Sequence, residues 1–223
     1  MTVKLRHPSA KIVGVKIAIL LYEGFTALDA IGPYEVLRSV PNWEVEFVAK
    51  QRGEVRTDSG VVGLTADRTL EETGAPEILL VPGGKGSRAK MKDEELLAWL
   101  RQVDETTKWT TSVCTGSLLL AAAGLLEGKQ ATGHWAWLEP LRDFGADPVG
   151  GRYVEDRKTI TAAGVSAGID MALYLVGREV GTEVAQAIQL GIEYDPDPPF
   201  DAGSPQKAPP QIVERVSAIS RAE

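Results

Sequence analysis

The chain has 223 residues, of which 43% are hydrophobic and 25% are charged, so it can bury an ordinary core. This composition excludes a disordered or collagen-like protein, and a single cysteine excludes a disulfide scaffold. A formal net charge of −7 disfavours nucleic acid as a partner, because an acidic surface repels phosphate backbones.

Residues 1–14 are predicted to be a loose, basic lead-in that carries Lys4, Arg6, His7 and Lys11. They lack the apolar centre of a secretory signal, so we expect a cytoplasmic protein whose cysteine stays a reduced thiol. The apolar stretch 118–126 is among the longest in the chain and falls well short of the ~20 residues that a bilayer requires. We therefore expect no contact with a membrane.

Strands and helices alternate over the first half of the chain. Buried strands are predicted at 15–22, 45–49, 77–81 and 109–113, with helices at 29–39, 94–103 and 116–126 and a small hairpin at 55–64. Asp93 is placed to cap the second of these helices, and Gly128 to stop the third.

The alternation continues in the second half of the chain, with strands at 149–155 and 158–163 and helices at 169–180, 183–190 and 211–220. Six prolines crowd residues 196–210 and predict a wrap or a linker. The order predicts a mainly parallel sheet with helices on both faces, and a ligand site beyond the carboxyl ends of its strands. Residues 15–223 are expected to form one such α/β domain with a proline-rich C-terminal wrap.

Cys114 is the candidate nucleophile. It joins an apolar strand to a buried helix, and Thr115-Gly116 after it suit a sharp turn. A thiol at a helix N-terminus faces free N–H groups and the positive end of the helix dipole, which predicts a lowered thiol pKa. The alternative is a buried structural cysteine, but the strand–turn–helix context favours a nucleophile elbow.

Backbone donors are expected from the neighbouring turn. Gly83 and Gly84 end the preceding strand, and the N–H groups of Gly84 and Thr115 are predicted to converge on negative charge that develops in a reaction. The alternative is a tight glycine turn that binds nothing.

Asp29 is the preferred acid–base candidate. It follows the first strand at a helix start, so it can project into the same crevice as Cys114. The alternative is a carboxylate that only caps the helix. His134 lies after a short strand and is either part of the site or a structural histidine.

Two motif matches are set aside. Gly164-Val165-Ser166-Ala167-Gly168 fits a serine nucleophile elbow, but no histidine follows His134 to serve as its base. The glycine-rich segment 84–89 follows the third strand rather than opening the domain, which disfavours a dinucleotide site. Metal-ligand spacings are absent from the sequence, so we expect no metal.

Several of these segments together resemble the ThiJ/PfpI superfamily, and the resemblance extends over nearly the whole chain from the first strand. It is carried by residues 28–33, 81–84 and 112–116. More narrowly, segments 111–117, 131–136 and 167–170 and the tail Pro-Pro-Phe-Asp-Ala-Gly-Ser-Pro (198–205) are similar to the isocyanide hydratases.

The resemblance implies a flavodoxin-like, class I glutamine amidotransferase-like sandwich, a homodimer, and cofactor-free addition of water to an isonitrile to give an N-substituted formamide. It implies that Cys114 attacks as a thiolate while Asp29, with a raised pKa, moves the protons. It further implies that Gly84 and Thr115 supply backbone donors, and that Gly83, His134, Gly164 and Val165 line the site.

Two alternative functions would use the same cysteine, Cys114. One is glyoxalase or deglycase chemistry on carbonyl substrates, and the other is a non-enzymatic redox or ligand sensor. Peptidase activity is disfavoured, because Thr115 stands where the protease-like branch has a histidine. Residues 161–166 depart from the hydratase pattern, which leaves the size of the substrate open.

Overall fold

A computed structural model gives the fold, and it describes residues 14–222. The predicted lead-in at 1–14 therefore lies almost wholly outside the described residues. None of the helices in the described part of the chain combines the length and the apolar character that crossing a bilayer requires.

A seven-stranded sheet forms the centre of the molecule, in the order β10-β11-β7-β6-β1-β2-β5. Every neighbouring pair is parallel except β10 and β11. The predicted mainly parallel sheet is thus confirmed. Its strands are β1 (Val15–Leu20), β2 (Trp43–Ala49), β5 (Arg68–Thr69), β6 (Ile78–Val81), β7 (Trp109–Val113), β10 (Tyr153–Asp156) and β11 (Thr159–Ala162).

Two further two-stranded sheets lie outside the main one. The predicted hairpin is confirmed as an antiparallel pair, and a short parallel pair was not predicted. They consist of β3 (Gly53–Arg56) with β4 (Gly63–Ala66), and β8 (Gln130–Ala131) with β9 (Asp147–Pro148).

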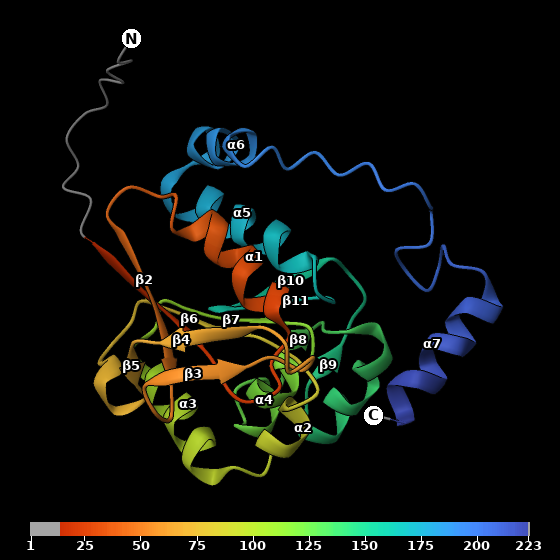
Figure 1. The fold of residues 1–223 in the computed structure, drawn as a ribbon, viewed down its shortest axis with the longest axis horizontal. Helices are drawn as coiled ribbons and strands as arrows, with labels where there is room; N and C mark the ends of the chain where they lie inside the picture. Colours follow the sequence, from red (N-terminus) through yellow and green to blue (C-terminus); the bar gives the residue numbers. More distant parts are fainter. Residues whose placement is uncertain (1–13, 223) are drawn as a thin grey trace.

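Helices cover both faces of the main sheet. Figure 1 shows α1, α5 and α6 on one face and α2, α3 and α4 on the other. The α-helices are α1 (Ala27–Leu37), α2 (Ser87–Lys90), α3 (Glu94–Thr106), α4 (Gly116–Ala122), α5 (Ala167–Val180), α6 (Thr182–Gly191) and α7 (Pro210–Ala222), and the 3₁₀-helices are Glu71–Thr73, Trp135–Trp137 and Glu139–Phe144.

Burial on both faces characterises the central strands of the sheet. All residues of β6 and β7 are buried, as expected for parallel strands covered on both faces. Asp93 caps α3 as predicted, because its side chain accepts a hydrogen bond from the Leu96 N–H. The core therefore lies on both sides of β1, β6 and β7, and it fixes the turns that follow these strands.

Two predicted boundaries are each wrong by four residues. The helix expected at 116–126 ends at Ala122, because Gly124 has a φ of +81° and turns the chain before Gly128 is reached. The strand expected at 149–155 begins only at Tyr153, after Gly150 and Gly151. Residues 196–209 run outside the main body between α6 and α7, where the wrap or linker was predicted (Figure 1).

Candidate active site

Cys114 occupies the turn between β7 and α4. Its φ of +59° lies in the left-handed region, which costs a residue with a side chain about 1–2 kcal/mol. The Cys114 N–H donates to the carbonyl oxygens of Ala162 and Ala163, both at 3.1 Å, and these bonds hold the turn against β11. The side chain is 6% exposed and lines a cavity of about 160 Å³. The turn thus has the geometry of the predicted elbow.

Asp29 lies in the first turn of α1 and is fully buried. Its Oδ2 accepts the Gly83 N–H at 2.9 Å, and its carboxylate is hydrogen-bonded to the thiol of Cys114. Its Oδ1 has no hydrogen-bond partner among the described residues. The capping alternative does not apply, because the N-cap of α1 is Thr26. The structure therefore brings Asp29 and Cys114 together.

Burial raises the pKa of Asp29 to about 7, although the hydrogen bonds from Gly83 and Cys114 oppose the shift. The resemblance implied a raised pKa at this carboxyl, and the direction is confirmed. A carboxyl with a pKa near neutrality can both accept and return a proton at physiological pH.

The predicted lowering of the Cys114 pKa is wrong. Burial raises this pKa, the nearby charge of Asp29 raises it further, and backbone N–H groups of Thr115 and Val165 only partly oppose the rise. Because the pKa of Cys114 lies above that of Asp29, the sulfur keeps its proton in the resting protein. The thiol then donates a hydrogen bond to the Asp29 carboxylate.

Gly83 makes the close approach of these groups possible. A Cβ atom at this position would lie 2.5 Å from the Thr115 N and 2.9 Å from Asp29 Oδ2. Since real Cβ atoms do not approach backbone so closely, only glycine lets β6 end against the Cys114 turn. Gly83 lies behind the cavity and does not line it.

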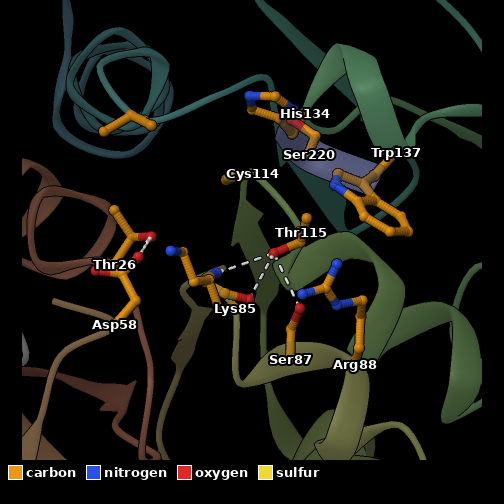
Figure 2. Close-up of a pocket in the computed structure, with 12 residues that line it drawn as sticks. Thr26, Asp58, Lys85, Ser87, Arg88, Cys114, Thr115, His134, Trp137 and Ser220 are labelled. Carbon is orange, nitrogen blue, oxygen red and sulfur yellow. Dashed lines mark hydrogen bonds between the residues drawn. The ribbon is translucent and has the colours of Figure 1, made fainter. Parts of the chain in front are cut away.

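The backbone donors differ in part from the prediction. Thr115 and Val165 each direct a backbone N–H at the Cys114 sulfur. The N–H of Gly84 instead donates to Thr115 Oγ1 at 2.9 Å, and the Ser87 hydroxyl donates to the same oxygen at 3.0 Å (Figure 2). In this arrangement Gly84 fixes Thr115, and its role as a donor to substrate stays a prediction.

His134 and Val165 line the Cys114 cavity, as predicted. His134 Nδ1 accepts the Ala136 N–H at 3.3 Å, and burial lowers the pKa of the imidazole, which favours its neutral form. Gly164 lines a second cavity of about 500 Å³ that His134 and Val165 share. A Cβ on Gly164 would lie 2.7 Å from His134 Cδ2, so glycine at this position leaves room for the imidazole.

Sequence reasoning missed much of the cavity wall. One side comes from the chain before α1 and from the β3–β4 connection, another from α2 and the 3₁₀-helix after His134, and a third from α7 (Figure 2). These segments are far apart in sequence and carry no motif, apart from the glycine-rich segment 84–89. The missed residues are Thr26, Asp58, Lys85, Ser87, Arg88, Trp137 and Ser220.

The Ser166 hydroxyl is hydrogen-bonded to a charged side chain and not to a general base. Its Oγ accepts a hydrogen bond from the Arg152 guanidinium at 3.0 Å, and Arg152 also binds Asp170 at 2.6 Å. This agrees with setting aside the serine elbow. Among residues 14–222, no group of three or more His, Cys, Asp or Glu side chains is placed to hold a metal ion.

Comparisons with known proteins give the relatives of the chain. Residues 15–178 match the DJ-1/PfpI family. An isonitrile hydratase from Pseudomonas putida is 43% identical over 202 residues, which cover 91% of this chain and 88% of that protein. A deglycase from Thermococcus kodakarensis is 25% identical over 150 residues, which cover 66% of this chain and 89% of that protein.

The solved structures agree with the sequence relatives. A crystal structure of a ThiJ/PfpI family protein from Pseudomonas syringae has a TM-score of 0.91 and 36% identity, covering 98% of this chain and 94% of that one. The expected class I glutamine amidotransferase-like sandwich is thereby confirmed. Since the family match runs from β1 into α5 and the hydratase aligns along nearly all of the chain, the protein belongs to the DJ-1/PfpI family and is a homologue of isonitrile hydratase.

Proposed function

We propose that this protein adds water to an isonitrile, R–N≡C, to give the formamide R–NH–CHO. The observation that carries the proposal is the hydrogen-bonded pair of Asp29 and Cys114 beside a cavity, in a chain 43% identical to an isonitrile hydratase. The pair supplies the two elements that the reaction needs, a nucleophile for the terminal carbon and one group that moves protons.

The first step forms a thioimidate. The sulfur of Cys114 attacks the terminal carbon of the isonitrile while its proton passes to the Asp29 carboxylate, so the sulfur reacts as a thiolate. Asp29 then gives this proton to the same carbon, and the product is R–N=CH–S–Cys114. The carboxylate is free again, and no further reactant is consumed.

Hydrolysis releases the formamide. Asp29 accepts a proton from water as the water oxygen bonds to the carbon, and returns it to nitrogen, giving R–NH–CH(OH)–S–Cys114. The C–S bond then breaks as C=O forms, and the hydroxyl proton passes through Asp29 to sulfur. The balance is one isonitrile and one water consumed for one formamide, with both side chains restored.

The surroundings of the pair support these steps. The N–H groups of Thr115 and Val165 point at the sulfur and stabilise negative charge on it during attack and release. The cavity of about 160 Å³ beside Cys114 gives room for the isonitrile group, and the cavity of about 500 Å³ that shares His134 and Val165 adjoins it. His134 is favoured as neutral imidazole by its lowered pKa, and we assign it to the wall of the site.

Turnover of cyclohexyl isocyanide tests the proposal. We expect formamide absorbance to grow with the unmodified protein and not with Cys114→Ala. A parallel assay for lactate formed from methylglyoxal separates this activity from the carbonyl chemistry of the rival reading. If several isonitriles are not hydrated while intact mass shows a reduced thiol, the hydratase proposal fails.

We further propose that residues 15–223 form one α/β domain and that the protein acts as a cytoplasmic homodimer. Large apolar side chains such as Leu190 and Phe200 are about four-fifths exposed, which supports a covering partner surface. An unpaired cysteine is suited to a reducing compartment. Light scattering after gel filtration should give twice the chain mass of 24.0 kDa, and a monomer would contradict the dimer.

A further inference from the structure

We propose that Arg88 forms an anion-binding subsite beside Cys114 and selects isonitriles that carry a carboxylate on the substituent R. The choice of isonitriles rests on the proposed function, whereas the binding of an anion beside the sulfur can be tested without it.

Arg88 faces the same cavity as the reactive sulfur. It lies in α2, directly after Ser87, which hydrogen-bonds to Thr115 in the Cys114 turn. Both Arg88 and Cys114 line the cavity of about 160 Å³. A group held by the guanidinium is therefore within the length of a small molecule from the sulfur.

The guanidinium is positioned by an aromatic ring. Its central carbon lies 4.7 Å from the ring centroid of Trp137, a cation–π contact that leaves the N–H groups at the guanidinium edge available to a ligand. Figure 2 shows Arg88 and Trp137 on one side of the cavity and Thr26 and Asp58 on the other. This contact orients Arg88 without neutralising its charge.

Charge pairing distinguishes Arg88 from its neighbour in α2. Lys90 lies 3.3 Å from Asp93, whereas no carboxylate within residues 14–222 forms an ion pair with Arg88. Asp58, the acidic side chain that lines this cavity, accepts the Thr26 hydroxyl at 2.6 Å on the opposite side. Arg88 thus keeps a positive charge facing the cavity.

The chemistry favours a carboxylate as the ligand. A guanidinium presents parallel N–H donors that match the two oxygens of a carboxylate, and such charged hydrogen bonds are stronger than neutral ones. Because Arg88 and Cys114 line the same cavity, a short chain of atoms is enough to join the anion to the isonitrile carbon. Isocyanoacetate, in which one methylene joins the two groups, is a suitable probe, and its hydration gives N-formylglycine.

Alkylation of Cys114 tests the subsite without any turnover. Iodoacetate and iodoacetamide differ in charge and hardly in size, and Cys114 is the single cysteine of the chain. We expect the rate ratio of iodoacetate to iodoacetamide to fall roughly ten- to a hundredfold in Arg88→Ala and less in Arg88→Lys. Arg142→Ala is the matched control, since Arg142 pairs with Glu139 on the surface, and its ratio should equal that of the unmodified protein.

Turnover then tests the substrate class. The ratio of kcat/KM for isocyanoacetate to that for its methyl ester should fall by a similar factor in Arg88→Ala, and in Arg142→Ala it should equal that of the unmodified protein. Raised salt should weaken the preference for the anion in the unmodified protein.

The outcomes separate the two proposals. Equal alkylation ratios in the unmodified protein and Arg88→Ala would overturn the anion subsite, even if every isonitrile is hydrated. A ratio that depends on Arg88, with no isonitrile hydrated, would support the subsite and overturn the hydratase proposal. If the ratio of kcat/KM for isocyanoacetate to that for its methyl ester is the same in the unmodified protein and in Arg88→Ala, the proposed selection of carboxylates is wrong.

Discussion

Two turns of this molecule are alike in form and differ in chemistry. The turn after β7 holds Cys114 and the turn after β11 holds Val165 and Ser166, and both lead from a parallel strand into a helix at the same edge of the sheet. Both contain a non-glycine residue with positive φ, +59° at Cys114 and +38° at Val165. Backbone geometry alone therefore does not distinguish a reactive turn from an inert one.

The difference lies in the group that each side chain faces. Cys114 donates to the buried carboxylate of Asp29, which can take its proton. Ser166 accepts from the guanidinium of Arg152, which has no acceptor atom for the hydroxyl proton. A nucleophile at a strand end becomes useful only where the fold places a proton acceptor opposite it.

The largest expected effect comes from removing the sulfur. Cys114→Ala should lower kcat for isonitrile hydration by at least about a thousandfold, because no other group can bond to the carbon. The fold should persist, since alanine occupies the same strained φ with a smaller side chain. Steady-state kinetics and a thermal melt measure both quantities, and residual turnover within about tenfold of the unmodified protein would contradict the role of Cys114.

Changing the partner of the sulfur should have the next largest effect. In Asp29→Asn the amide oxygen can still accept the Gly83 N–H, but the side chain cannot shuttle a proton. We expect kcat/KM to fall by roughly a hundred- to ten-thousandfold, the range of general acid–base catalysis. Near-normal hydration by this variant, with the Cys114 thiol intact, would show that another group moves the protons.

The buried carboxyl also links stability to pH. Burial raises the pKa of Asp29 from 3.8 to about 7, so the folded protein binds more protons than the unfolded chain between these values. The free energy of unfolding should therefore decrease as pH rises across this window, by up to about 4 kcal/mol from this group. Catalysis should show the opposite trend, because the carboxylate is the form that accepts the thiol proton.

Urea denaturation at several pH values checks this linkage. Asp29→Asn lacks the charge, so its stability relative to the unmodified protein should increase as pH rises from about 4 to about 7. Parallel stability curves for the two proteins would refute the raised pKa.

The smallest expected effect belongs to the second turn. Ser166→Ala removes one hydrogen bond from Arg152, which retains Asp170. Hydration should stay within about twofold of the unmodified rate, and stability should drop by about 1 kcal/mol. A large loss of kcat in Ser166→Ala would mean that the two turns share the catalytic work.

The sequence predicts the central elements well because burial shapes local composition. The five residues of β7 are all buried, although three of them are Thr or Ser, and the predicted strand matches Trp109–Val113. Shorter elements escape such patterns. No helix is predicted for the four residues of α2, which follow Gly84 and Gly86, and in the fold they contact α4.

The site could be predicted only in part. Cys114 and Asp29 lie at strand and helix ends whose positions follow from the order of elements. The direction of the thiol pKa could not be predicted, because it depends on how completely the sulfur is shielded from water. Arg88, Trp137 and Ser220 come from segments that meet only in the folded chain.

Ser220 in α7 belongs to the wall of the Cys114 cavity. An affinity tag or a fluorescent fusion joined after this helix would thus stand within a few residues of the cavity and could obstruct the passage of small molecules. The start of β1 lies at the opposite edge of the sheet from the Cys114 turn, since β1 and β7 run in the same direction. An affinity tag or a fluorescent fusion is better attached before β1.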